Sequence, residues 1–186
     1  KTLAHQNVTV RCENRLLTLS FEGTVIKEES IEQSEKESEK KQISDQSVPE
    51  KEADIIISPF IQDGKKGSLW LVPRCIVVGV GCRRKKEAAL IKQTICERLA
   101  QSGIAKEAVC QITSIDCKKD EAGLIETAAD FNVEFVTFTE EKLRQVPGNF
   151  SSSAFVEKTV GVDNVCERSA MAAAPQGILL ARKYAK

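Results

Sequence analysis

Beyond Pro73, short apolar runs alternate with segments in which apolar residues recur at helical spacing. A short run of β-branched residues is typical of a strand buried on both faces, and apolar residues three or four apart mark one face of a helix. The pattern predicts strands at 75–80, 109–115, 133–138 and 178–181, and helices at 84–102, 121–131 and 140–145, with one more beginning near residues 151–153 and a last one opening at Asn164. Strands that alternate with helices need crossover connections. We therefore expect an α/β fold, a mostly parallel sheet with flanking helices, preceded by a small partial β-containing region.

Several of these boundaries have a local physical cause. Gly103 is placed to end the helix at 84–102, because glycine adopts the left-handed conformation of a helix end at little cost. Pro147 limits the helix at 140–145. Asn164 followed three residues later by Glu167 forms a capping box, which predicts a helix start there.

The first 72 residues are organised differently. Alternating apolar residues over 8–26 predict a hairpin or two short strands, and 55–60 and 69–72 predict two more. Residues 27–52 carry five lysines and nine acidic residues with few large aliphatic ones, which favours a charged flexible linker or loop at 27–53. An exposed helix stabilised by opposite charges is the alternative. This divides the chain at 1–26, 27–53, 54–72 and 73–186.

Composition and charge narrow the classes of function. Lys plus Arg and Asp plus Glu each number 27, so the overall charge favours neither nucleic acid nor an anionic membrane as a partner. The seven cysteines include no Cys-x-x-Cys pair and there is one histidine, which argues against a zinc site and for reduced thiols in a cytoplasmic protein. No apolar run approaches the roughly 18 residues of a membrane span. The chain begins at Lys1 without methionine or signal peptide, so we expect it to start partway through a longer protein.

The end of the predicted strand at 75–80 carries the first candidate site. Gly79 and Gly81 allow a sharp turn or the close approach of a ligand, and Arg83 and Arg84 offer fork-shaped donors suited to carboxylate or phosphate. A turn from strand to helix can need glycine for its geometry alone. The third glycine of a dinucleotide fingerprint and the Gly-Lys-Ser/Thr ending of a P-loop are both absent.

The next strand ends in a second polar segment, 114–121. If the two strands are neighbours, their carboxyl ends meet at one edge of the sheet. Five side chains would then converge on a cationic pocket with carboxylates available for proton transfer: Arg83, Arg84, Lys118, Asp116 and Glu121.

Each candidate also has a purely structural interpretation. Asp120 and Glu121 suit the amino terminus of a helix, and Lys118 can simply be solvated. Cys82 has positive charge beside it, which favours a nucleophilic thiolate, but no histidine base is near in sequence, so packing is the default. The capping box already accounts for Glu167.

Three motifs, taken in order, resemble one known family. The segments 79–84, 114–121 and 161–170 are similar to the carboxy-terminal domain of the CbiG family of anaerobic cobalamin biosynthesis, which is related to the smaller protein CobE. The likeness covers residues 73–184, and 55–60 resembles the end of the family's middle region. Residues 1–26 and 54–72 would then be parts of that middle domain. The family's amino-terminal domain is absent from this chain.

The resemblance implies an activity and a site. The activity is hydrolysis of the lactone of cobalt-precorrin-5A, giving cobalt-precorrin-5B and acetaldehyde. Asp116 and Glu121 would be catalytic, and seven residues would bind the substrate: Gly79, Gly81, Cys82, Arg83, Arg84, Lys118 and Glu167. Cobalt would arrive inside the tetrapyrrole, so no cofactor or metal site is expected.

The expected partners are the cobalt-containing tetrapyrrole and other enzymes of the cobalamin pathway, with no nucleic acid and no membrane. Two alternatives remain open: a non-catalytic tetrapyrrole-binding module, as a CobE-like helper would be, and a surface that docks another pathway enzyme. The absent amino-terminal domain also leaves open whether this chain acts alone.

Overall fold

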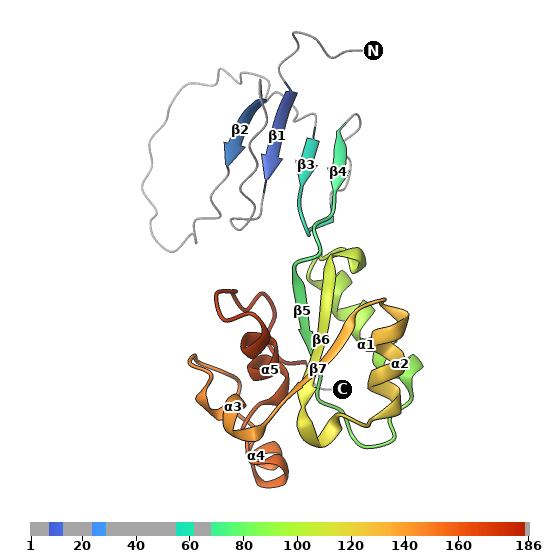
Figure 1. Ribbon diagram of the computed structural model, residues 1–186, viewed down its shortest axis with the longest axis vertical. Helices are drawn as coiled ribbons and strands as arrows, with labels where there is room; N and C mark the ends of the chain where they lie inside the picture. The colour runs from blue at the N-terminus through green and yellow to red at the C-terminus, as the bar shows by residue number, and fades with distance from the viewer. Residues whose placement is uncertain (1–7, 13–23, 29–54, 62–67, 185–186) are drawn as a thin grey trace, which may run out of the picture. The chain divides into compact units, whose positions relative to one another are not determined.

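The computed structural model describes residues 8–12, 24–28, 55–61 and 68–184 (Figure 1). The chain divides into two compact units, Lys1–Pro73 and Arg74–Lys186. The first unit holds a four-stranded parallel sheet in the order β2-β1-β3-β4, built from β1 (Val8–Cys12), β2 (Thr24–Glu28), β3 (Ile55–Ile57) and β4 (Leu69–Leu71). The strands predicted here are confirmed.

The hairpin considered for residues 8–26 is wrong, because β1 and β2 run parallel and parallel strands need a crossover rather than a tight turn. The predicted linker at 27–53 lies outside the described residues, apart from Lys27 and Glu28, which end β2.

The second unit contains a three-stranded parallel sheet in the order β5-β6-β7. Its strands are β5 (Ile76–Gly79), β6 (Val109–Ile115) and β7 (Glu134–Phe138). The central strand is buried on both sides, with Val109, Ile112 and Ile115 at most 4% exposed. Full burial of an isoleucine side chain contributes about 1.5–3 kcal/mol, so β6 anchors the unit. The three strands predicted at 75–80, 109–115 and 133–138 are confirmed.

Helices cover both faces of this sheet, as the predicted α/β class requires. They are α1 (Ala88–Gln101), α2 (Ala122–Asp130), α3 (Glu140–Gln145), α4 (Ala154–Val160) and α5 (Val165–Ala173), with short 3-10 turns η1 (Lys106–Ala108) and η2 (Asp116–Lys118). Figure 1 shows α1 and α2 on one face, and α3 and α5 on the other. In the described part of the chain, no helix has the length and apolar character needed to cross a bilayer.

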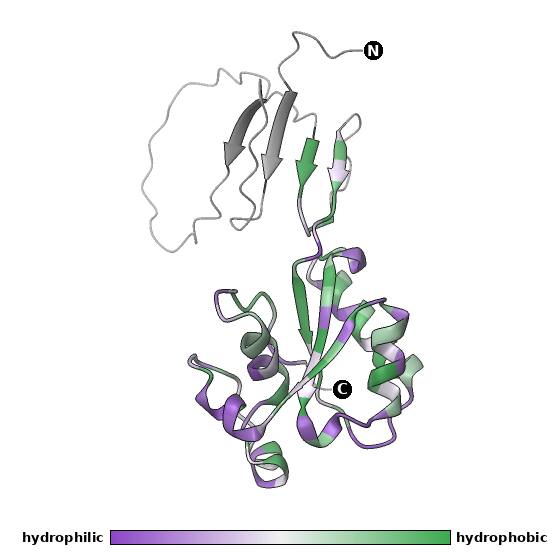
Figure 2. Ribbon diagram, viewed as in Figure 1, coloured by the Kyte–Doolittle hydropathy of each residue, from purple (hydrophilic) through white to green (hydrophobic). Residues whose placement is uncertain are grey.

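The hydrophobic core follows from the periodicities of the sequence. On α1 the buried residues Ala88, Ile91, Ile95 and Leu99 recur every three or four positions and face inward. On the α5 side, Leu143, Val162 and Val165 pack with Ile115 of β6. Figure 2 shows the result: β5 is hydrophobic along its length, whereas the connections below the strands are hydrophilic.

Two predicted elements differ from the structure. The helix expected at 84–102 begins at Ala88, because residues 84–87 form a loop in which Lys85 has φ 58°. The strand expected at 178–181 is wrong: residues 177–180 have no regular secondary structure, and Ile178 is 78% exposed. Gly103, with φ 65°, ends α1 as expected.

Candidate functional site

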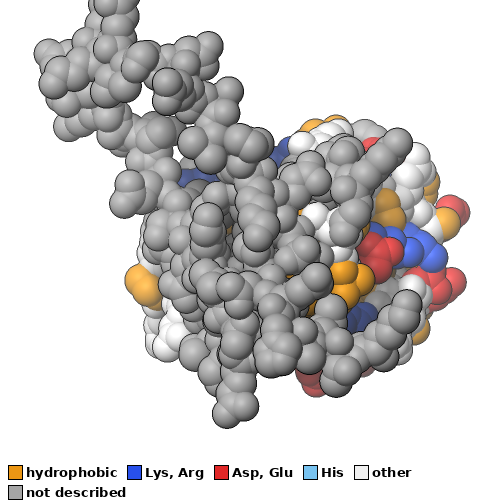
Figure 3. All heavy atoms as spheres, turned by 90° about the horizontal axis from the view of Figure 1, so that it is seen from above, with side chains coloured by type: hydrophobic (Ala, Val, Ile, Leu, Met, Phe, Trp, Pro, Cys, Tyr) orange, Lys and Arg blue, Asp and Glu red, His pale blue; other side chains and the backbone are white. Residues whose placement is uncertain are grey.

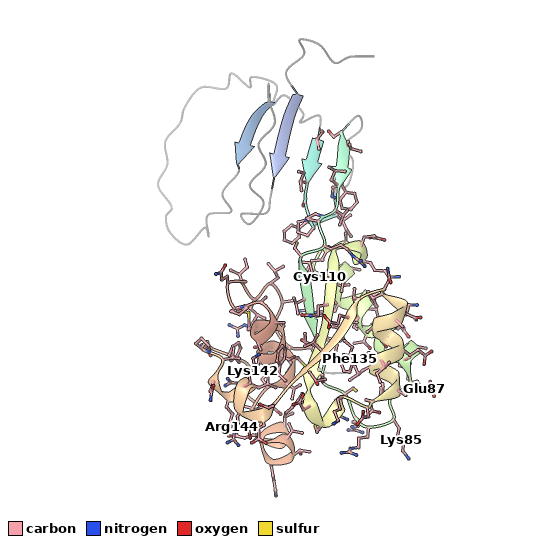
Figure 4. The ribbon with its side chains drawn as sticks, in the orientation of Figure 1. Lys85, Glu87, Cys110, Phe135, Lys142 and Arg144 are labelled. Atoms are coloured by element: carbon pink, nitrogen blue, oxygen red, sulfur yellow. The ribbon has the colours of Figure 1, made fainter. Side chains whose placement is uncertain are left out.

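Two loops lie side by side at the carboxyl ends of β5 and β6. Because these strands are parallel neighbours, the first rim loop (residues 80–87) and the second rim loop (residues 116–121) leave the same edge of the sheet. The Val80 amide donates to the Thr113 carbonyl at 2.8 Å, and the Ser114 hydroxyl donates to the Val80 carbonyl at 2.7 Å. Figure 4 shows Lys85 at this end of the unit. The two loops therefore meet at one edge of the sheet, as the sequence predicts, but they do not form the single cationic pocket that was expected.

Close helix packing accounts for Gly79. A Cβ at this position would lie 1.8 Å from the carbonyl oxygen of Cys166 and 2.9 Å from the hydroxyl oxygen of Ser169, both on α5. The missing side chain lets α5 lie directly against the end of β5. Gly81 is exposed and less crowded, since its Cβ would be 3.3 Å from the Cys166 sulfur. The assignment of both glycines to substrate binding stays a prediction.

Glu121 joins the two rim loops. One of its carboxylate oxygens accepts a hydrogen bond from the Lys85 amide, and the other lies 3.5 Å from Nζ of Lys118. The Glu121 and Lys118 side chains are only 12% and 10% exposed. Lys85 itself is in the left-handed region, which costs a residue with a side chain roughly 1–2 kcal/mol. The first rim loop therefore holds a strained conformation that contacts from the second loop help to fix.

A hollow of about 460 Å³ opens beside this junction. It is lined by the first turns of α1 and α2 and the end of the first rim loop: Arg84, Lys85, Lys86, Glu87, Ala88, Asp120, Glu121, Ala122, Gly123 and Glu126. Positive and negative groups are mixed in this lining. Figure 3, which views the molecule from the opposite end, shows basic and acidic side chains next to each other on the described surface there as well. Arg83 and Arg84 are exposed, and within the described residues their side chains make no hydrogen bond or ion pair.

Asp116 lies in a different hollow. This second space, of about 300 Å³, lies between the ends of β6 and β7 and the end of α4, and is lined by Ile115, Asp116, Cys117, Thr139, Glu140, Thr159 and Val160. The two predicted catalytic carboxylates, Asp116 and Glu121, thus belong to one rim of the sheet but line separate spaces. Their catalytic roles stay predictions.

Cys82 is half-buried on the first rim loop. Burial raises the pKa of its thiol, and the positive charge of Lys118 only partly opposes this effect, while Glu121 and Cys166 add to it. A raised pKa keeps the thiol protonated at neutral pH, so the local electrostatics do not favour a nucleophilic thiolate. The six cysteines of the described range 68–184 are all free thiols.

Glu167 is the most enclosed of the predicted site residues, at 2% exposure. Its amide donates to the Asn164 side chain at 2.9 Å, which confirms the predicted helix cap. Its carboxylate accepts hydrogen bonds from the Ser151 amide and hydroxyl, at 3.0 and 2.7 Å, and from the Lys183 amide at 2.6 Å. Burial acts to raise the pKa of Glu167, yet these donors together with Arg182 hold that pKa below its usual value. Hydrogen bonds within the chain therefore account for the burial and the ionised state of this carboxylate. Its role in substrate binding stays a prediction.

Sequence reasoning missed the residues that complete these features. Ser151, Arg182 and Lys183 gather around Glu167, and Thr139 with Glu140 lines the second hollow. Only Thr139 and Glu140 could have been predicted as site residues from the sequence. They directly follow the strand predicted at 133–138, whose carboxyl end lies at the same edge of the sheet. Among the described residues, no three or more His, Cys, Asp or Glu side chains are grouped as a metal site would require.

Two curated proteins are similar in sequence to part of this chain. The curated cobalt-precorrin-5A hydrolase of Salmonella typhimurium is 41% identical over 95 residues, which are 51% of this chain and 27% of that protein. The cobalt-precorrin-5A hydrolase of Priestia megaterium is 33% identical over 99 residues, which are 53% of this chain and 26% of that protein. The chain thus matches only about a quarter of each relative's length.

A solved structure shares the fold of the second unit. The crystal structure of CobE, a protein from the cobalamin (vitamin B12) biosynthetic pathway, superposes with a TM-score of 0.51 at 27% identity, covering 54% of this chain and 71% of CobE. The family model described as "Cobalamin synthesis G C-terminus" matches residues 76–186, a range that includes both rim loops. The chain belongs to this family, CbiG_C.

Proposed function

We propose that this chain is the carboxy-terminal part of a cobalt-precorrin-5A hydrolase and acts in cobalamin biosynthesis. The 41% identity to the Salmonella typhimurium enzyme carries the proposal. The family match adds support, because it spans the unit that contains both rim loops and both hollows. Since each hydrolase relative is about four times longer than the matched stretch, the activity belongs to the longer protein of which this unit would be one part.

In the proposed reaction one water is consumed, the lactone of the macrocycle opens, and a two-carbon fragment leaves as acetaldehyde. The substrate's peripheral carboxylates suit guanidinium groups, which make charge-assisted and bidentate hydrogen bonds to them. Arg83 and Arg84 are the candidates for this contact, because both are exposed on the first rim loop. Asp116 is the candidate for moving protons, since it lines a hollow at the same edge of the sheet.

Cobalt would enter this site inside the macrocycle, as part of the substrate, so the proposal assigns the chain no cofactor of its own. The natural setting would be the cytoplasm, where free thiols stay reduced, and other enzymes of the pathway would be its partners.

Acetaldehyde release tests the function. Cobalt-precorrin-5A is incubated with this chain and with the longer protein, and acetaldehyde is measured by coupling to an NADH-dependent alcohol dehydrogenase. We expect acetaldehyde from the longer protein. If the longer protein binds the macrocycle but releases no acetaldehyde, the hydrolase assignment is wrong and a binding module takes its place.

The arginine contact has its own test. Replacing Arg83 and Arg84 together with alanine should weaken macrocycle binding by about 10-fold or more, because charge-assisted hydrogen bonds to carboxylates are lost. Binding is followed by the change in macrocycle absorbance. The control replaces Lys106 and Lys158 with alanine, which removes two exposed positive charges outside the first rim loop. Equal affinity of the two double variants would rule out the arginine contact.

A further inference from the structure

We infer that Glu121 is a positioning residue, whose carboxylate fixes the shape of the first rim loop and so presents Arg83 and Arg84 to the substrate. On this assignment Glu121 exchanges no proton with the substrate. The inference rests on the proposed function only for its ligand, a macrocycle rich in carboxylates.

The first observation is that both oxygens of the Glu121 carboxylate are already engaged. One accepts the Lys85 amide and the other faces the Lys118 ammonium at 3.5 Å. With 12% of the Glu121 side chain exposed and 10% of Lys118, this pair is largely shielded from solvent. A general acid or base must reach the reacting atom within hydrogen-bond distance, and a carboxylate enclosed in this way has little surface left for that contact.

The second observation is that the first rim loop depends on such a contact. Lys85 has φ 58°, a conformation that persists in a residue with a side chain only where its surroundings enforce it. On its other side the loop is packed tightly, because a Cβ on Gly123 of α2 would lie 2.1 Å from the Lys86 carbonyl oxygen. The loop that carries both arginines is therefore held at Lys85 by a charge-assisted hydrogen bond and at Lys86 by close packing.

The third observation is the contrast with Asp116. Within the described residues, no hydrogen bond or ion pair engages the Asp116 carboxylate, and it lines the separate hollow beside Thr139 and Glu140. The two carboxylates thus differ in whether their oxygens are already bound by other residues of the protein. Asp116 is open to a ligand, and Glu121 is committed to the loop.

Two variants separate positioning from proton transfer. Glu121→Ala removes both contacts, whereas Glu121→Gln keeps a carbonyl oxygen that can accept the Lys85 amide. Glu107→Gln, an exposed acid on η1 at the other end of the sheet, is the control. Three quantities are measured: hydrogen exchange of the Lys85 amide in this chain, affinity for a carboxylate-rich porphyrin such as uroporphyrin from its absorbance, and kcat and KM for cobalt-precorrin-5A in the longer protein.

For Glu121→Ala we expect Lys85 amide exchange to be at least about 10-fold faster and the macrocycle Kd to rise about 10-fold. Glu121→Gln should restore both to within about 3-fold of the parent, and the effect on turnover should lie in KM, with kcat and its pH profile unchanged. The control should change none of these quantities.

Two outcomes would overturn the inference. One is a loss of kcat of about 100-fold or more in Glu121→Gln with unchanged Kd, which is the behaviour of a proton-transfer group. The other is unchanged Lys85 exchange and unchanged Kd in Glu121→Ala. If the parent protein shows no turnover at all, the proposed function fails, and the exchange and porphyrin measurements still decide the role of Glu121.

Discussion

Gly79 shows how one residue can serve packing at a site that suggests ligand binding. In sequence, glycine before two arginines looks like a place where a ligand approaches the backbone. In the structure the space that a side chain would need is filled by the backbone of α5 at Cys166. Gly103 is needed for another reason, since no atom lies within 4 Å of its would-be Cβ but its φ is 65°.

These two glycines give a prediction at the residue scale. Gly79→Ala should lower the free energy of unfolding by about 3 kcal/mol, because α5 has to move away from β5. Gly103→Ala should lower it by only about 1 kcal/mol, the cost of a left-handed alanine. Urea unfolding followed by far-ultraviolet circular dichroism measures both, since every described helix lies in the second unit. Equal losses in the two variants would contradict the packing explanation.

At the scale of elements, the sequence predicts best where local pattern and tertiary environment agree. Strand β6 matches its predicted range, because its apolar residues Val109, Ile112 and Ile115 are all buried, as expected for a strand covered on both faces. The start of α1 was predicted four residues too early, since the polar stretch before Ala88 suits a helix and nothing local reveals that Glu121, 36 positions away, accepts the Lys85 amide.

The end of the chain fails as a strand prediction for a similar reason. Its apolar residues fit a strand locally, but the Lys183 amide donates to the carboxylate of Glu167 and the Arg182 carbonyl accepts from the side chain of Arg98 at 3.5 Å. The site shows the same limit. Parallel neighbouring strands end at the same edge of a sheet, so the sequence predicts that the two rim loops lie together. The separation of Asp116 and Glu121 into two hollows depends on β7 and α4, which the local sequence does not reveal. Contacts with distant side chains are not encoded in a local pattern.

Glu167 allows a prediction about how elements are held together, because its carboxylate links the start of α5 to residue 151 and to residues 182–183. Glu167→Gln should lower the free energy of unfolding by about 2 kcal/mol at neutral pH, since buried donors lose a charged acceptor. The folded pKa of Glu167 lies below its unfolded value of about 4.3, so its contribution is complete above that pH and is lost as the pH falls through the lower folded pKa.

Urea unfolding of both proteins at several pH values tests this sign. The difference between the parent and Glu167→Gln should be constant from neutral pH down to about pH 5 and then shrink as the solution becomes more acidic. The exposed Glu157 of α4 provides the control, and Glu157→Gln should match the parent throughout. A difference that grows on acidification would mean that the carboxylate is not stabilised in its ionised form.

At the scale of the whole molecule, all the residues of the proposed site lie in the second unit. Both rim loops, both hollows and the buried cluster of Ile115, Leu143, Val162 and Val165 lie within Arg74–Lys186. The part of CobE that matches is also most of a separate protein, at 71% of its length. A unit with its own core can be expected to fold by itself.

We therefore predict that residues 74–186, produced alone, unfold in one cooperative transition and bind the macrocycle within about 3-fold of the whole chain. Thermal unfolding by circular dichroism and an absorbance titration check the two parts. A gradual transition without a midpoint would show that the first unit is required for folding. Cooperative unfolding with lost affinity would show instead that residues before Arg74 contact the ligand.

The contacts of Arg182 have one more consequence. Its carbonyl is held by Arg98 of α1 and its guanidinium by Glu167 of α5, and these helices lie on opposite faces of the sheet. Residue 182 therefore joins the two helical layers directly, in addition to the contacts that each layer makes with the sheet. Replacing Arg182 with alanine would remove its guanidinium contact with α5 and leave the carbonyl contact with α1 in place.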